Sequence, residues 1–128
     1  MDEVTINPRA TLRRHQDEVD YSQAKLTGGL KRLIDEEPIV EFEHWLVIQN
    51  RFPYSVAFKI HHLLLPRRLV ALESELTQEE IDEFRRIKRD FGPKYDILLE
   101  NLGASRSVLD HYHVHLLTYY DKREEMGL

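Results

Sequence analysis

The chain has 128 residues, the size of one ordinary domain, and 41% of them are hydrophobic, which is enough for a buried core. Its net charge of -5, with both signs mixed along the sequence, argues against the broad basic face that a nucleic-acid polymer requires. The lack of cysteine excludes disulfides and thiolate chemistry, and no apolar run is long enough for a membrane span. Since no secretory pattern opens the chain, we expect a cytoplasmic protein that binds neither membranes nor nucleic-acid polymers.

The first third of the sequence predicts little regular structure. Residues 1–20 are polar and weakly periodic, which is typical of an arm or a frayed helix. A helix is predicted over residues 21–37, although Gly28 and Gly29 weaken it, and Pro38 marks its end.

The next part of the chain predicts strands. Residues 39–42 and 45–48 are β-branched and aromatic, a turn follows at 50–54, and a long extended run covers 56–65. We therefore divide the single domain into an N-terminal arm and helix (1–37), a main body (38–120) and a C-terminal tail (121–128).

The clearest helix starts after Thr77, which acts as N-cap and forms a capping box with Glu80. Its apolar residues repeat at helical spacing: Ile81, Phe84, Ile87 and Phe91. Gly92-Pro93 breaks it, and we expect a second helical piece over residues 95–102, followed by a last strand over 108–120. This order predicts an α+β fold, with an antiparallel sheet and helices packed on it.

Three histidines alternate on the predicted last strand. Side chains on a strand alternate between its two faces, so His111, His113 and His115 should share one face, opposite Tyr112 and Val114. The row has three interpretations: a half-exposed strand, a metal site, or a site of phosphoryl chemistry. The outer two α-carbons lie about 13 Å apart, so a zinc ion would more easily take two of them with a histidine from elsewhere. A neutral imidazole is a good nucleophile near pH 7, and a row of three suits phosphoryl transfer without strain.

The segment from His111 to Leu117 resembles the signature of the histidine-triad family at every position. Three further segments are similar to the family pattern: Asn50 to Tyr54, His61 to Arg68, and Asn101 to Val108. The resemblance covers about residues 38 to 118, and the triad is its strongly specific part. It implies a histidine-triad-like fold, with about five strands in the antiparallel sheet, and a nucleotide as the small-molecule partner.

The resemblance also implies roles for individual residues. His113 would attack the α-phosphorus and become nucleotidylated, His115 would contact the phosphate and leaving group, and His111 and His61 would complete the catalytic set. The implied substrate-binding residues are Asn50, which would contact ribose, and Asn101, Arg106 and Ser107, which would contact phosphate. No cofactor and no metal are implied, and a homodimer is expected because family members commonly pair.

The sequence departs from the family pattern around the triad. Residues 106–110 replace the usual Gly-Gln-Ser/Thr-Val, and residues 117–119 replace the usual Gly-Gly or Pro-Arg. These differences favour an outlying branch of the family over a standard member. The resemblance implies a hydrolase or nucleotidyltransferase that acts on a phosphoanhydride or phosphoramidate of a nucleoside 5′-phosphate. A nucleotide-binding module without turnover and a zinc-binding protein that uses His61 with triad histidines are the alternatives.

Overall fold

The structure, a computed structural model, describes residues 10–103, 108 and 110–127. In this part of the chain five strands form one antiparallel sheet in the order β1-β2-β3-β5-β4. The strands are β1 (Pro38–Glu41), β2 (Trp45–Gln49), β3 (Phe58–Pro66), β4 (Ile97–Leu99) and β5 (Val114–Tyr119). The α-helices are α1 (His15–Thr27) and α2 (Gln78–Asp90), and short 3₁₀ helices cover Leu33–Asp35, Glu73–Glu75, Gly92–Lys94 and Arg123–Glu125. The expected α+β fold with a five-strand antiparallel sheet is confirmed.

Helix α2 begins as its sequence predicts. The Thr77 hydroxyl accepts the backbone N–H of Glu80 at 3.2 Å, and the Glu80 carboxylate accepts the N–H of Thr77 at 2.7 Å. The indole N–H of Trp45 donates to the Glu80 carbonyl at 2.9 Å, and its ring lies 5.0 Å from that of Phe84. The reciprocal cap and the buried indole together fix α2 against the sheet.

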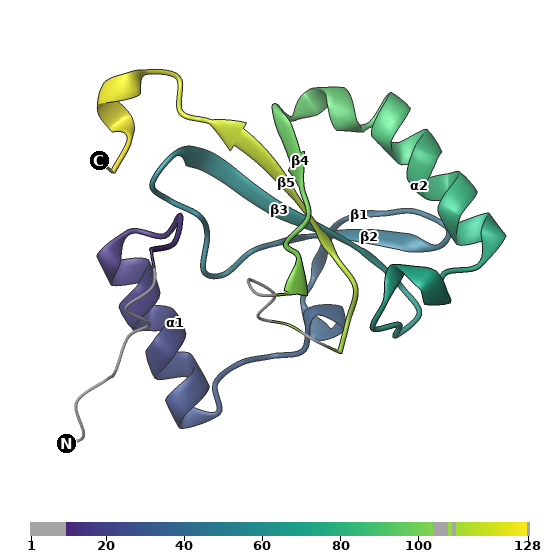
Figure 1. Ribbon diagram of the computed structural model, residues 1–128, viewed down its shortest axis with the longest axis horizontal. Helices are drawn as coiled ribbons and strands as arrows, with labels where there is room; N and C mark the ends of the chain where they lie inside the picture. The colour runs from purple at the N-terminus through teal and green to yellow at the C-terminus, as the bar shows by residue number, and fades with distance from the viewer. Residues whose placement is uncertain (1–9, 104–107, 109, 128) are drawn as a thin grey trace.

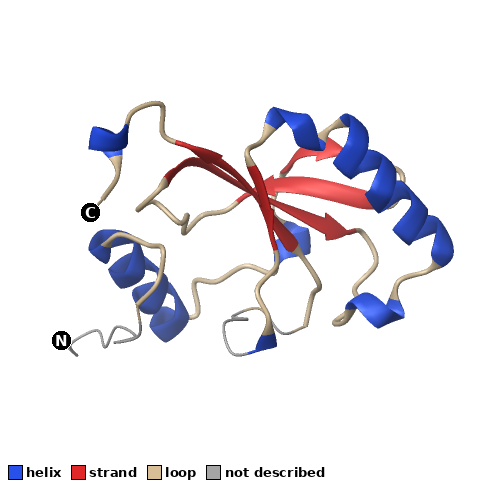
Figure 2. Ribbon diagram, turned by 45° about the horizontal axis from the view of Figure 1, so that its top comes forward, coloured by secondary structure: helices blue, strands red, loops and turns tan. Residues whose placement is uncertain are grey.

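The two faces of the sheet carry different clusters of buried side chains. The face toward α2 buries Trp45, Val47, Leu64, Val70, Ile87, Tyr112, Val114 and Leu116. The other face buries Leu46, Ile48, Leu63 and Leu65, covered by Leu33 and Ile34, and a further group of Tyr54, Ala57, Phe58 and Leu117. Helix α1 and helix α2 lie at opposite sides of the molecule in both ribbon views (Figure 1, Figure 2).

The helix predicted over residues 95–102 is wrong, because this segment forms strand β4. The N–H of Asp96 donates to the Leu117 carbonyl at 2.9 Å, and Ile97 pairs with Leu117. Ile97 and Leu99 pack inward while Leu98 is exposed, which is the two-residue period of a strand. A run of three apolar residues fits a short strand as well as part of a helix, so periodicity alone could not decide.

The N-terminal helix is displaced from its predicted position over residues 21–37. Helix α1 starts at His15 and stops at Thr27, where Gly28 adopts the left-handed conformation with φ of 71°. This glycine ends the helix because its backbone takes a positive φ at little cost. Only Glu18 and Tyr21 are buried in α1, so the helix lacks the apolar stripe that would have revealed it. None of the described helices is long and apolar enough to cross a membrane.

Candidate active site

The last strand is shorter than predicted, and only His115 of the three histidines lies in it. Strand β5 starts at Val114, which pairs with Leu64 of β3. The N–H of Tyr112 donates instead to the Val70 carbonyl at 2.6 Å, beyond the end of β3. The chain therefore leaves the ladder before Val114, and His111 and His113 precede the strand. Tyr112, Val114 and Leu116 nevertheless lie in the cluster beneath α2, as alternation predicts.

The ring of His113 is oriented by the backbone two residues before it. Its Nδ1 lies 2.9 Å from the carbonyl oxygen of His111. Since a carbonyl oxygen only accepts hydrogen bonds, Nδ1 carries the proton of the neutral ring and Nε2 carries the lone pair. The half-buried ring thus has its nucleophilic nitrogen on the edge away from the backbone.

His61 and His115 form a buried hydrogen-bonded pair across β3 and β5. The backbone N–H of Tyr54 donates to Nδ1 of His61 at 2.9 Å, so neutral His61 holds its proton on Nε2. That Nε2–H donates to Nδ1 of His115 at 2.7 Å. Nδ1 of His115 is therefore an acceptor, and neutral His115 holds its own proton on Nε2. A backbone amide of the loop before β3 in this way fixes the tautomers of both rings.

The surroundings of this pair keep both rings neutral. His61 is 1% exposed and His115 is 4% exposed. Burial is the largest cause that lowers the pKa of His61 to about 2 and that of His115 to about 3, and the charges of Arg13 and of neighbouring histidines contribute to both shifts. Near neutral pH the pair therefore supplies oriented hydrogen bonds but no positive charge.

Asn101 meets this pair from the segment after β4. Its side-chain nitrogen is placed 2.7 Å from the Tyr54 hydroxyl and 3.3 Å from Nε2 of His115. Two donors cannot face each other, so with a proton on Nε2 the amide presents its oxygen to both groups. Asn101 then accepts from His115 and from the Tyr54 hydroxyl, and it holds the donor of His115 at the site.

Asn50 stabilises a local turn and also lines the pocket, while its contact with ribose stays a prediction. Its side-chain oxygen accepts the N–H of Phe52 at 2.8 Å, which is the local turn expected before a proline. Its side-chain nitrogen lies 3.3 and 3.2 Å from Nδ1 and Nε2 of His61, and the residue lines the pocket beside His113 and His115. His62, the residue after His61, does not take part in these contacts, and its Nδ1 lies 2.7 Å from the Tyr95 hydroxyl.

His111 does not line this pocket, contrary to the prediction that all three histidines share one face. It is 2% exposed, and its Nε2 donates to the carbonyl of Pro66 at 2.8 Å. Its Nδ1 has no hydrogen-bond partner among the described residues. Its contact with the site is made through its carbonyl, which orients His113. Arg106 and Ser107 lie outside the described residues, so their predicted phosphate contacts stay predictions.

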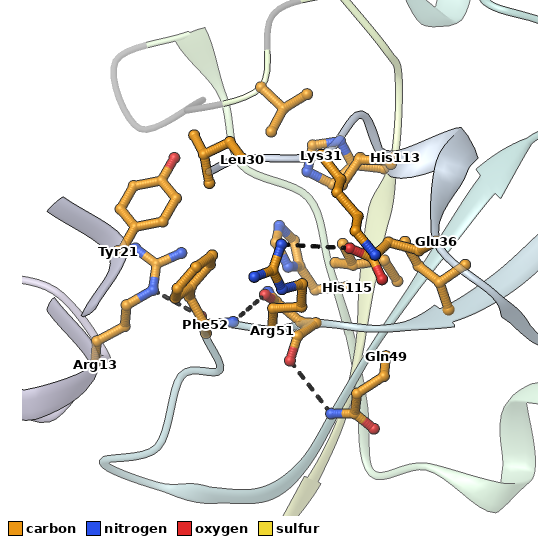
Figure 3. A pocket seen from close by; sticks show the side chains of 15 residues that line it. Arg13, Tyr21, Leu30, Lys31, Glu36, Gln49, Arg51, Phe52, His113 and His115 are labelled. Atoms are coloured by element: carbon orange, nitrogen blue, oxygen red, sulfur yellow. Dashed lines mark hydrogen bonds and ion pairs between the residues drawn. The ribbon is translucent and has the colours of Figure 1, made fainter. Parts of the chain in front are cut away.

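A pocket opens beside His113 and His115 on the face of the sheet opposite α2 (Figure 3). Strand β2 and the loop after it line one wall with Ile48, Gln49, Asn50, Arg51 and Phe52. The N-terminal segment lines another wall with Arg13, Tyr21, Leu30, Lys31, Leu33 and Glu36. Sequence reasoning missed this second wall, because a polar, weakly periodic segment carries no signal of a site. The pocket combines apolar surface with cations next to two histidines.

The His61–His115 pair uses its Nδ1 lone pairs within the protein. Nδ1 of His61 accepts from a backbone N–H, and Nδ1 of His115 accepts from His61. A zinc ion at this pair would have to break one of these hydrogen bonds. In the part of the chain that the structure describes, no three histidine, aspartate or glutamate side chains are placed to hold a metal ion.

The buried pair predicts that acid weakens the fold. The pKa values of His61 and His115 are lowered in the folded state, so only the unfolded chain takes up these protons as the pH falls below about 6.5. The free energy of unfolding should then fall by about 1.4 kcal/mol per pH unit for each ring, until the pH approaches the folded pKa values. Urea denaturation at several values between about pH 7 and about pH 4 measures this slope. His115→Phe should reduce the slope, and equal slopes in the variant and the wild type would contradict the prediction.

The architecture agrees with solved structures of histidine-triad proteins, although no protein-family model matches the chain. A protein described as HIT-like is 23% identical over 75% of this chain and 94% of its own, with a TM-score of 0.51. A hypothetical histidine-triad nucleotide-binding protein from Sulfolobus tokodaii is 21% identical over 77% of this chain and 68% of its own, with a TM-score of 0.52. A HIT family hydrolase from Clostridium thermocellum is 24% identical over 77% and 88%, with a TM-score of 0.48. The first two of these matches show that the chain has the fold of the histidine-triad proteins.

Proposed function

We propose that the protein is a nucleotide hydrolase or nucleotidyltransferase that works through a covalent intermediate on His113. The substrate class is a phosphoanhydride or phosphoramidate of a nucleoside 5′-phosphate. The observation that carries the proposal is the pairing of two oriented nitrogens in one pocket: a lone pair on Nε2 of His113 and a proton on Nε2 of His115. A nucleophile with a hydrogen-bond donor beside it is the minimum that phosphoryl transfer requires.

In the first step Nε2 of His113 attacks the α-phosphorus. A phosphorus–nitrogen bond forms, and the bond from phosphorus to the leaving group breaks with its electron pair. A phosphate leaving group departs as an anion, and an amine takes its proton from water. The carbonyl of His111 accepts from Nδ1–H throughout, and so it stabilises the positive charge that develops on the His113 ring.

His115 acts in this step as a neutral donor. Because burial lowers its pKa to about 3, the ring does not carry the second proton that an efficient general acid gives up near neutral pH. In the free protein its Nε2–H faces Asn101, and on substrate binding we expect it to donate instead to an oxygen that gains negative charge. A neutral imidazole held in this way supplies electrostatic stabilisation without proton transfer.

In the second step an acceptor oxygen attacks the phosphorus of the intermediate. If the acceptor is water, the phosphorus–nitrogen bond breaks, the electron pair returns to Nε2 of His113, and the water proton passes to solvent. The product is a nucleoside 5′-monophosphate. Another phosphate or alcohol in place of water would make the protein a transferase.

The composition of the pocket supports a nucleotide as the ligand. Ile48, Leu33 and Leu63 give it apolar surface of the kind that a base or ribose contacts, and Arg13 and Lys31 give it positive charge. The pocket therefore offers apolar contacts for the nucleoside and positive charge for the phosphate. The Sulfolobus protein of the same fold is described as nucleotide-binding, which agrees with this proposal.

Intact-protein mass spectrometry tests the mechanism directly. The protein is mixed with a panel of nucleoside phosphoramidates and dinucleoside polyphosphates, and the reaction is stopped without acid because phosphorus–nitrogen bonds are acid-labile. We expect a mass increase of one nucleotidyl group that is absent in His113→Asn. Saturable nucleotide binding with neither adduct nor turnover would overturn the proposal and would identify a binding module instead.

We also predict that two copies of the chain pair in solution. Two-fold pairing is the commonest form of oligomer, and the solvent-facing side of α2 is a regular surface on which a second copy could pack. Light scattering at working concentration should give twice the chain mass of 15.3 kDa. A monomer mass that persists as the protein is concentrated would refute this prediction.

A further inference from the structure

The positive charge of the pocket comes from residues other than His61 and His115. His61 and His115 are neutral near pH 7 because burial lowers their pKa values. The other charged groups that line the pocket are Arg13, Lys31, Arg51 and Glu36. Three cations and one anion give this set a net charge of +2, in a chain whose net charge is -5. A locally positive pocket in an acidic protein points to an anionic ligand.

Arg13 is the least exposed cation of this group. Its side chain is 11% exposed, whereas that of Arg51 is 43% exposed and lies 3.8 Å from Glu36. The Arg13 guanidinium lies 4.5 Å from the ring centre of Tyr21 and 5.2 Å from that of Tyr54. A charge held between two rings and away from water interacts more strongly with an anion than an exposed one does.

The backbone on both sides of Arg13 is tied to the loop before β3. The carbonyl of Leu12 accepts the N–H of Val56 at 2.9 Å, and the N–H of Arg14 donates to the Ser55 hydroxyl at 3.1 Å. The Nε of Arg13 itself donates to the Phe52 carbonyl at 2.7 Å. These bonds fix one edge of the guanidinium and determine where its remaining donors lie.

The remaining donors of Arg13 are available to a ligand. Nη1 lies 3.6 Å from the Glu18 carboxylate, which is an ion pair longer than a hydrogen bond. Nη2 makes no hydrogen bond to any residue in the described part of the chain. Arg13 also lowers the pKa values of His61 and His115 through its charge, so its field reaches the histidine pair.

We propose that Arg13, supplied by the segment before α1, is the anion-binding residue of this pocket and contacts a phosphate of the ligand. The identity of that ligand as a nucleotide rests on the proposed function, whereas the contact with a phosphate does not. Arg13 contributes the formal charge that the neutral histidines lack. Through Arg13 the N-terminal segment becomes part of the binding site, where it would favour a phosphorylated ligand such as a nucleotide over an uncharged nucleoside.

The experiment compares Arg13→Gln with Arg14→Gln as a matched control. Arg14 is the next residue, but its guanidinium donates to the Glu125 carbonyl and lies over the Tyr120 ring, away from the pocket. Dissociation constants are measured by calorimetry for AMP and adenosine. We expect Arg13→Gln to weaken AMP binding about 10- to 100-fold, the range for a lost charge-assisted hydrogen bond, and to change adenosine binding less than about 2-fold. Arg14→Gln should bind both as the wild type does.

Two further readouts separate a lost contact from a lost fold. Arg13→Lys keeps the charge without the planar fork, so it should recover part of the AMP affinity. Added salt should weaken AMP binding less in Arg13→Gln than in the wild type. Unchanged AMP binding in Arg13→Gln, or equal losses for AMP and adenosine, would overturn the proposal.

A third probe keeps the inference separate from the proposed function. If the wild type binds no nucleotide, the proposed function fails, and inorganic phosphate then decides on Arg13. Phosphate should shift the NMR signals of His113 and His115 in the wild type and in Arg14→Gln but not in Arg13→Gln. No response to phosphate in the wild type, or the same response in Arg13→Gln, would show that Arg13 is not an anion site.

Discussion

Replacement of His113 by alanine or asparagine should abolish turnover, with a loss of at least about 10⁴-fold in kcat. The neutral ring holds its proton toward the His111 carbonyl and its lone pair on Nε2, and neither alanine nor the asparagine amide has a nucleophilic nitrogen. Because the side chain is half-buried rather than part of the core, the fold and most of the nucleotide affinity should remain. Steady-state kinetics with each variant, together with a binding measurement, checks both parts.

His62→Phe is a suitable control for this experiment. His62 lies on the opposite face of β3, where its ring contacts the Tyr95 hydroxyl, and it takes no part in the site. Its replacement should leave kcat near the wild-type value. Turnover by His113→Asn at a similar rate would exclude His113 as the nucleophile.

Replacement of His115 by phenylalanine should lower kcat by about 10²- to 10³-fold, which is the usual effect of removing one positioned donor from a charged transition state. Phenylalanine preserves a ring beside Tyr54, whose centre lies 5.0 Å from that of His115, but it lacks Nε2–H. The loss should appear mainly in kcat, because the donor acts most strongly on charge that develops during the reaction.

The effect should also depend on how the donor is held. His61→Phe removes the N–H that fixes the tautomer of His115, so its kcat should fall as well, although His61 need not touch the substrate. The double variant should lose less than the sum of the two single free-energy effects, since both changes remove the same donor. A kcat of His115→Phe near the wild-type value would contradict the role of His115 as a hydrogen-bond donor in the reaction.

The parts of the fold that were predictable from sequence are those with a strong local pattern. The cap at Thr77 and the apolar spacing through Ile87 specify α2, and the β-branched runs specify β1 and β2. The ends of elements were less predictable, because partners distant in sequence decide them. Strand β5 begins at Val114, and the N–H of Tyr112 before it bonds to Val70 outside the ladder, which periodicity cannot show.

In the candidate site, too, some residues were predictable from the sequence and others were not. The motif of alternating histidines predicted that His113 and His115 lie together, and the structure places them on one pocket, with ring centres 5.2 Å apart. The register of β3 placed His61 beside them, as expected from its position before Pro66. Arg13 and Tyr21 were not predictable, because their contribution depends on how a distant segment folds back onto the loop after β2.

Helix α1 has a thermodynamic consequence that follows from how it is attached. It buries only Glu18 and Tyr21, and its preceding segment is joined to the loop before β3 by a few hydrogen bonds. A unit with so little apolar burial opens locally at a lower free energy than the sheet requires for global unfolding. Its amide hydrogens should therefore exchange with solvent sooner than those of β3 and β5. A ligand that contacts Arg13 would slow that exchange in α1 before it changed any amide of the sheet.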